Sequence, residues 1–151
     1  MKKVLTFLII LIPWFFGNLL VNNYNHYYQS LNLPFFAPSK TIFLIIWTLL
    51  YIMITRSIYI IYQEYYYPNI KEYNKTLLIN YLATQLFPLI FFGLKSPFLG
   101  FVTAIAILIS SLFLYYETRK LNVISAKWLI PYIIWNIFLV ILTLTIYFMS
   151  F

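Results

Sequence analysis

The chain has 151 residues, of which 64% are hydrophobic, 23% aromatic and only 9% charged. Soluble domains usually carry about 25% charged residues, so this composition excludes an ordinary soluble domain, and its hydrophobicity excludes intrinsic disorder. Ten Lys and Arg against three acidic residues give a net charge of +7. In a membrane protein such an excess lies in the loops as a topology signal, so we expect a lipid bilayer and no nucleic acid as partner. The chain has no cysteine, which excludes disulfides and thiolate chemistry.

The chain contains five continuous apolar runs. A helix needs about 20 residues to cross a bilayer, and each run has a similar length. They cover residues 4–21, 41–63, 76–94, 97–116 and 128–149. Continuous rather than alternating hydrophobicity favours helices over the strands of a barrel. The sequence therefore predicts an all-α fold, an integral membrane bundle of five transmembrane helices that forms one domain over residues 1–151.

The first run also has features of a signal peptide, because Lys2 and Lys3 precede it. Residues 13–16 read Pro-Trp-Phe-Phe rather than the small residues of a cleavage site, so we expect a retained helix. No segment rich in Arg and Ser precedes this run, which favours a bacterial plasma membrane over a mitochondrial one.

Basic residues predict the orientation of the bundle. With five spans, the N-terminus and the second and fourth loops share one side, and the first and third loops share the other. The first side carries seven cations and the second carries two, so the N-terminus is expected inside and the C-terminus outside. The seven are Lys2, Lys3, Lys71, Lys75, Arg119, Lys120 and Lys127, and the two are Lys40 and Lys95.

Groups for acid–base or metal chemistry are scarce. The single histidine, His26, falls in the first loop, and Glu64, Glu72 and Glu117 fall in or beside the loops of the cation-rich side. No predicted span contains Asp, Glu or His, whereas proton-coupled transporters normally need an ionisable residue at membrane depth. One histidine and scattered glutamates cannot form a metal site. We expect no metal, no required cofactor and no conventional acid–base catalysis.

Aromatic residues lie inside the predicted spans as well as at their ends. Trp47 and Tyr51 are four residues apart, as are Tyr132 and Asn136, so each pair shares one helix face. Such residues can line a pocket for a large hydrophobic small molecule between the helices, or they can simply pack the helices together. The candidate pocket residues are Trp47, Tyr51, Phe87, Phe91, Tyr132, Trp135 and Asn136.

Residues 27–38 read YYQSLNLPFFAP, and residues 46–51 read IWTLLY. They are similar to W-Y-x-x-L-x-K-P-x-x-x-P-P followed by a W-T-x-L-Y helix, the pattern of the TspO/MBR family of tryptophan-rich sensory and translocator proteins. Residues 129–135, LIPYIIW, resemble the family's L-x-P-Y-x-x-W. Pro13 with Gly17 fits its first-helix P-x-x-x-G, and residues 91–94, FFGL, fit the end of its third helix. The resemblance covers nearly the whole chain.

The resemblance implies a five-helix receptor or sensor, often a homodimer, that binds porphyrins such as protoporphyrin IX or haem beneath the first loop. A link to transport or degradation of the ligand is also implied. By analogy, Trp47 and Trp135 form the aromatic walls, and Tyr28 and Pro34 lie in the covering loop. The ligand's propionates would meet Lys40 or His26. The other implied ligand contacts are Tyr51, Phe87, Phe91, Tyr132, Asn136 and Leu139.

Two alternatives stay open. Some family members promote light-dependent porphyrin breakdown, in which case Trp135 and Trp47 would act as electron donors. A scaffold with a filled pocket is the other alternative, because several departures make the pocket tighter and less polar. In the first loop, Tyr27 replaces the family's tryptophan, Leu33 its lysine before proline, and Ala37 the first of its paired prolines. In the third helix, Thr84 and Phe87 replace an Asn and a Trp, and in the fifth helix Leu139 replaces a small residue.

Overall fold

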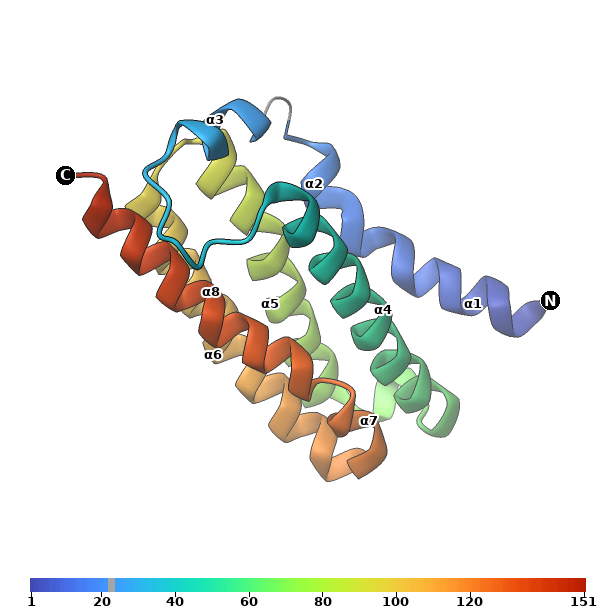
Figure 1. Cartoon of the computed structure of the whole chain (residues 1–151). Coiled ribbons are helices and arrows are strands. Elements are labelled where there is room, and N and C mark those ends of the chain that lie inside the picture. Colours follow the sequence, from blue (N-terminus) through green and yellow to red (C-terminus); the bar gives the residue numbers. More distant parts are fainter. Residues whose placement is uncertain (22–23) are drawn as a thin grey trace.

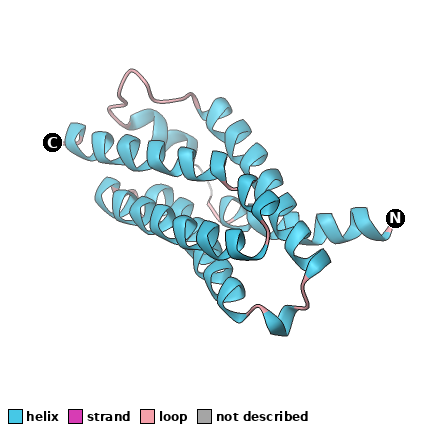
Figure 2. Ribbon diagram, turned by 90° about the horizontal axis from the view of Figure 1, so that it is seen from below, coloured by secondary structure: helices cyan, strands magenta, loops and turns pink. Residues whose placement is uncertain are grey.

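A computed structural model describes residues 1–21 and 24–151, and in this part of the chain all regular structure is helical (Figure 2). Figure 1 shows the elements as a bundle of long helices with one connection arched over its end. In chain order they are α1 (Lys2–Leu11), η1 (Ile12–Phe15), α2 (Phe16–Leu19), α3 (Tyr24–Ser30), α4 (Lys40–Glu64), η2 (Tyr67–Asn69), α5 (Lys71–Pro88), η3 (Leu89–Gly93), α6 (Pro97–Leu121), α7 (Val123–Lys127) and α8 (Ile130–Met149).

Within the described residues, five helical segments are long and apolar enough to cross a membrane. This confirms the predicted all-α, five-helix integral membrane fold. The segments are Lys2–Leu19, Lys40–Glu64, Lys71–Gly93, Pro97–Leu121 and Val123–Phe148. The predicted third span started five residues too late and the fourth ended five residues too early. Hydropathy marks only the lipid-facing length, whereas α5 and α6 continue through polar residues such as Glu72 and Arg119.

Polar side chains fix where several helices begin. Ser39 accepts a hydrogen bond from the amide of Ile42 at the start of α4, and Ser96 accepts one from Leu99 at the start of α6. Asn122 caps α7 through the amide of Ser125. Each cap satisfies an amide that the first turn of a helix leaves without a partner, so these residues define the loop boundaries.

The first span is broken in its middle. Pro13 lacks an amide hydrogen, and residues Ile12–Phe15 form a tight 3-10 turn between α1 and α2. The side chain of Gln85 on α5 bonds to both sides of this break: its Nε2 donates to the carbonyl of Trp14 over 3.0 Å, and its Oε1 accepts from the amide of Gly17 over 2.6 Å. We call this arrangement the Gln85 clamp. Before this break α1 diverges from α5 (Figures 1 and 2) but keeps contact with α4, where the ring of Phe7 lies 6.2 Å from that of Tyr59.

Pro88 breaks the third span in a comparable way. It ends α5, and the chain continues through the wider π-helical turn η3. The missing proline amide favours this change of hydrogen-bond pattern. The turn directs Phe91 and Phe92 into the interior, where both are buried. A proline therefore helps to place aromatic rings beneath the connection between α2 and α4.

Candidate functional site

The two predicted wall residues meet in the interior of the bundle. The rings of Trp47 on α4 and Trp135 on α8 lie edge to face, with centroids 6.3 Å apart. Phe43 touches both of them, at 6.3 Å from Trp47 and 5.7 Å from Trp135. Tyr51 and Tyr132 lie within 5.5 and 6.4 Å of Trp47. These five rings form one cluster, which we call the aromatic interior, and the edge-to-face arrangement is the favourable one for aromatic pairs.

A lid covers the aromatic interior, formed by residues 26–39 of α3 and the loop after it. Tyr28 is buried, its ring lies 6.2 Å from that of Phe43, and its hydroxyl donates to the carbonyl of Pro38 over 2.8 Å. Pro34 is buried as well, and its carbonyl accepts a hydrogen bond from Ala37. Burial raises the pKa of the Tyr27 and Tyr28 phenols above their ordinary value, so both stay neutral at physiological pH.

Phe87 and Phe91 form a second aromatic layer on α5 and η3. Their rings are stacked at 5.4 Å, and both lie against Phe92, which in turn approaches Tyr28 of the lid. Phe91 also packs on Gly100 of α6, where a Cβ would overlap its ring. The predicted pocket residues Phe87 and Phe91 therefore support the lid from the side of α5 and α6.

Polar side chains form a network under the aromatic interior. The Tyr132 hydroxyl donates to Oδ1 of Asn80 over 3.1 Å and lies 2.8 Å from Oγ1 of Thr84. Asn80 donates onward to Ser110 on α6 over 2.9 Å. The network joins α5, α6 and α8 with fully buried groups. The sequence interpretation missed Asn80, although it is the only asparagine inside the third predicted span and lies one turn before Thr84.

Asn136 lies beside this network. It is fully buried on α8, one turn after Tyr132, yet neither its amide nitrogen nor its oxygen makes a hydrogen bond. It lies near the Tyr132 hydroxyl, which Asn80 and Thr84 already engage. The indole Nε1 of Trp135 is also buried without a partner. Buried polar groups normally have hydrogen-bond partners, so unpartnered groups beside predicted pocket residues mark a place where a ligand can supply them.

The aromatic interior is closely packed in this structure. Leu139 is fully buried beside the predicted pocket residues of α8. The cavity next to Trp47 measures only about 10 Å³, and Val21 and Phe92 form part of its wall. The same two residues also line a hollow of about 460 Å³ on the outer side of η3, together with His26, Tyr27 and Lys95. Val21 and Phe92 therefore lie between the outer hollow and the small cavity beside Trp47.

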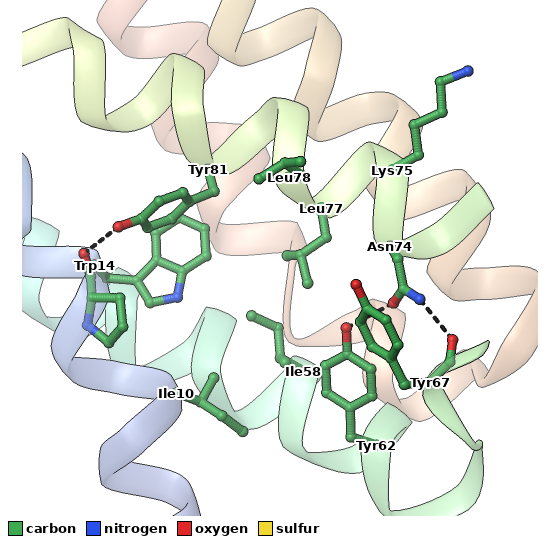
Figure 3. Close-up of a pocket in the computed structure, with 11 residues that line it drawn as sticks. Ile10, Trp14, Ile58, Tyr62, Tyr67, Asn74, Lys75, Leu77, Leu78 and Tyr81 are labelled. Carbon is green, nitrogen blue, oxygen red and sulfur yellow. Dashed lines mark hydrogen bonds between the residues drawn. The ribbon is translucent and has the colours of Figure 1, made fainter. Parts of the chain in front are cut away.

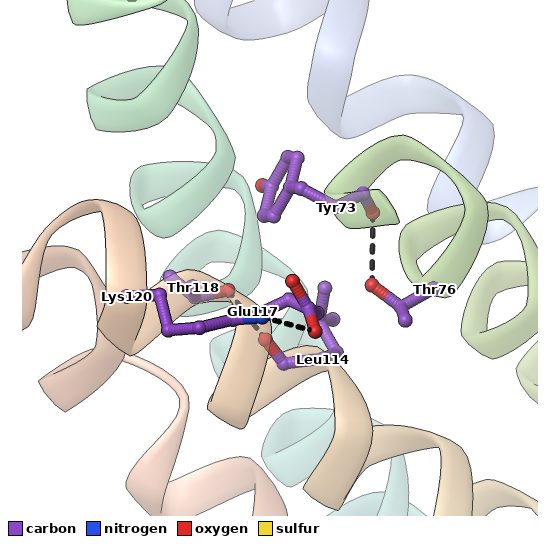
Figure 4. Close-up of polar contacts among 6 residues, drawn as sticks. All are labelled: Tyr73, Thr76, Leu114, Glu117, Thr118 and Lys120. Atoms are coloured by element: carbon purple, nitrogen blue, oxygen red, sulfur yellow. Dashed lines mark hydrogen bonds and ion pairs between the residues drawn. The ribbon is translucent and has the colours of Figure 1, made fainter. Parts of the chain in front are cut away.

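The opposite end of the bundle carries an ion pair. Figure 4 shows Lys120 paired with Glu117, with 2.7 Å between Nζ and Oε1, near Tyr73 and Thr76 of α5. Among the described residues no three His, Cys, Asp or Glu side chains gather to hold a metal ion. The aromatic interior with its unpartnered polar atoms is therefore the best candidate for a functional site.

Gly100 and Ala104 have the spacing of a helix-dimerisation motif. Both are buried within the chain, where Gly100 accommodates the ring of Phe91. This pair therefore serves packing between η3 and α6 and is not presented to a second copy. The homodimer implied by the resemblance stays a prediction.

The fold and this site define a polytopic α-helical membrane protein whose aromatic interior surrounds a buried polar network. Residues 4–149 match the sequence profile of the TspO/MBR family, and the chain belongs to that family. The match spans nearly the whole chain and confirms the resemblance drawn from the motifs.

Individual relatives agree with this assignment. The chain is 33% identical to the tryptophan-rich protein TspO of Bacillus cereus over 121 residues, which cover 80% of this chain and 78% of the relative. It is 31% identical to the membrane protein YtaB of Bacillus subtilis over 120 residues, or 80% and 77% of the two chains. A tryptophan-rich protein TspO of Archaeoglobus fulgidus is 26% identical over 155 residues, or 99% and 97%.

Proposed function

We propose that this membrane protein is a receptor or sensor that binds a porphyrin or related tetrapyrrole in the aromatic interior. The observation that carries the proposal is that two buried polar groups beside the aromatic interior, the Asn136 amide and the Trp135 indole nitrogen, have no hydrogen-bond partner. Membership of the TspO/MBR family supports it. A flat conjugated macrocycle can stack its face on one of the two perpendicular indoles, Trp47 or Trp135, and meet the other with its edge, and its polar atoms can meet the amide of Asn136.

Access for such a ligand is proposed from the lid side of η3. The hollow beside His26 and Lys95 offers cationic or hydrogen-bonding groups to the propionates of a porphyrin, with Lys95 as the charge-assisted partner. Phe92 and Val21 then have to move before a macrocycle reaches Trp47, because the cavity there is too small for it. Because the ring of Phe92 contacts Tyr28 of the lid, its movement couples binding to opening of the lid, which loosens the hydrogen bond between Tyr28 and Pro38.

The proposed setting is a bacterial plasma membrane with the N-terminus inside and the C-terminus outside. The distribution of cations over the loops supports this orientation, and two of the matched relatives come from Bacillus species. In this orientation the lid and the hollow beside His26 face the outside, so the ligand arrives from there.

The test is a titration with protoporphyrin IX in the dark, following tryptophan fluorescence of the detergent-purified protein. Trp135→Phe removes one wall and one unpartnered nitrogen, whereas Trp128→Phe removes a partly exposed tryptophan outside the aromatic interior and serves as the matched control. Saturable quenching that weakens in Trp135→Phe but not in Trp128→Phe supports the proposal. Linear quenching that neither variant changes means partitioning into the micelle and contradicts it. Illumination of a saturable complex then tests photo-oxidative breakdown, which requires Trp135 or Trp47 as electron donor.

A second candidate is a membrane scaffold that keeps the fold with a filled pocket. The close packing around Leu139 and the cavity of about 10 Å³ beside Trp47 favour it. The two candidates differ in ligand-induced stability. A ligand that binds only the folded protein raises the unfolding free energy by about 2.7 kcal/mol at one hundred times its dissociation constant, whereas a scaffold shows no change in melting temperature.

A further inference from the structure

A second concave region lies outside the aromatic interior, between α1, α4 and α5. Its volume is about 560 Å³, the largest of the described cavities, and Figure 3 shows its lining. Ile10 of α1, Ile58 of α4 and Leu77 and Leu78 of α5 form its apolar wall. We call it the lateral groove. It exists because α1 diverges from α5 beyond the Gln85 clamp, and α1 itself has no buried residue.

Three polar side chains that line the lateral groove, Tyr62, Asn74 and Tyr81, already have hydrogen-bond partners. The Tyr81 hydroxyl donates to the carbonyl of Pro13 over 2.9 Å, and the Tyr62 hydroxyl donates to Oδ1 of Asn74 over 2.7 Å. Asn74 in turn donates to the carbonyl of Tyr67 over 2.8 Å. These three side chains therefore need no polar group from an occupant. A hydrocarbon chain fits this lining, because it offers contacts to the apolar wall and removes no hydrogen bond.

The position and length of the groove match one leaflet of a bilayer. Its lining on α5 runs from Asn74 to Tyr81, which is about 10 Å along the helix axis. One half of the hydrocarbon core is about 15 Å thick, so the groove covers the upper part of one leaflet beneath the headgroups. Leu78 and Tyr67, on its rim, are 57% and 63% exposed, so the groove opens sideways to lipid.

Charge at the rim selects the headgroup. Lys75 is exposed at the end of the groove near Asn74 and Tyr67, and Figure 3 shows its side chain extending away from the lining. An ammonium group in that position reaches a headgroup outside the groove rather than its interior. This end of the bundle is the cation-rich one, with seven Lys and Arg against three Glu by the five-span topology. Basic clusters beside transmembrane helices attract anionic lipids.

We propose that the lateral groove is a binding site for an anionic phospholipid, with one acyl chain against Leu77 and Leu78 and the phosphate beside Lys75. This proposal is independent of the proposed tetrapyrrole site, because the residues on which the lipid site rests are different from those of the aromatic interior. Bound lipid fills the space between α1 and α5, on the side of the first span that does not pack against α4.

The experiment is native mass spectrometry of the full chain in detergent, titrated with dioleoylphosphatidylglycerol or dioleoylphosphatidylcholine, which have the same acyl chains. We expect retained phosphatidylglycerol adducts with several-fold higher affinity than phosphatidylcholine. Lys75→Gln should weaken phosphatidylglycerol binding by about fivefold, in keeping with the effect of one lysine near a lipid surface. Lys127→Gln, at the same end of the bundle but on α7, should change it little.

A second pair of variants tests the groove itself. Leu78→Trp places a large ring over the groove and should abolish retention of phosphatidylglycerol. Ile79→Trp is the matched control, because Ile79 is the next residue of α5, is 51% exposed and does not line the groove. If Leu78→Trp fails to fold, the affinities of Lys75→Gln and Lys127→Gln for the two lipids still test the proposal.

Three results would overturn the proposal. Equal binding of both lipids means that the site does not select an anionic headgroup. If Leu78→Trp and Ile79→Trp change the retention of phosphatidylglycerol by the same amount, the lipid binds unspecifically around the bundle. A dimer that Leu78→Trp dissociates means that a second copy of the chain, rather than a lipid, covers the groove.

Discussion

The aromatic interior and the lateral groove use similar residues, aromatic rings with a few polar groups, but they differ in openness and in hydrogen bonding. The interior is closed, with a cavity of about 10 Å³, and it buries unpartnered polar atoms of Asn136 and Trp135. The groove is open, with about 560 Å³, and its Tyr62, Asn74 and Tyr81 are engaged. The difference indicates two kinds of occupant: a ligand with polar atoms for the interior, and a hydrocarbon chain for the groove.

The boundary between the two regions is the Gln85 clamp, and we expect its loss to have the largest effect. Gln85→Leu leaves the carbonyl of Trp14 and the amide of Gly17 buried without their side-chain partner. Each unsatisfied buried group costs about 1–3 kcal/mol, so the unfolding free energy should fall by about 3 kcal/mol. The measurement is a denaturant titration in detergent. Gln63→Leu, on an exposed position of α4, is the control and should stay within about 0.5 kcal/mol. A Gln85→Leu protein as stable as its control would show that the clamp does not hold the break.

The second prediction concerns the packing that closes the interior. Gly100→Ala introduces a Cβ that overlaps the ring of Phe91, and that ring is held by Phe87 and Phe92. Overpacking of this kind should destabilise the protein by about 2 kcal/mol in a thermal or denaturant measurement. Gly93→Ala is the matched control, because no atom lies within 4 Å of its added Cβ. Equal stability of the two variants would mean that Phe91 moves freely and that the interior opens without cost.

The third prediction is that two asparagine substitutions change the unfolding free energy in opposite directions. Asn136→Leu removes an unpartnered buried amide and should raise the unfolding free energy by about 1 kcal/mol while weakening porphyrin binding. Asn80→Leu removes partners of Tyr132 and Ser110 and should lower the unfolding free energy by about 1–2 kcal/mol. Thermal melts with and without protoporphyrin IX measure both effects. Destabilisation by Asn136→Leu would contradict the proposal that this amide has no partner until a ligand binds.

The smallest expected effect is at the lid. Tyr28→Phe removes the hydrogen bond to the carbonyl of Pro38 and should cost about 1 kcal/mol, with faster hydrogen exchange in residues 26–39 and faster association of porphyrin. Tyr27→Phe is the control, because the Tyr27 hydroxyl is buried without a partner and its loss should cost nothing. Equal exchange rates in the two variants would show that this hydrogen bond does not fasten the lid.

The sequence predicted the membrane spans well because span length and continuous hydrophobicity are local properties. Ends of α5 and α6 were missed where polar residues continue the helix beyond the hydrocarbon. The motifs predicted that Trp47 and Trp135 belong to one site, and the structure brings their rings to 6.3 Å. The chemistry of Asn136 was not predictable, because an unpartnered amide is defined by the absence of neighbours from other helices.

By itself, therefore, the sequence determined an all-α bundle of five membrane-spanning helices, the family, and the aromatic character of the interior. Only the tertiary structure decided that Gln85 holds Gly17 from 68 residues away, that both Asn80 and Thr84 bond to the Tyr132 hydroxyl, and that a groove opens between α1 and α5. The physical reason is that hydrophobicity and length act within each helix, whereas hydrogen bonds, cavities and clamps depend on how separate helices pack.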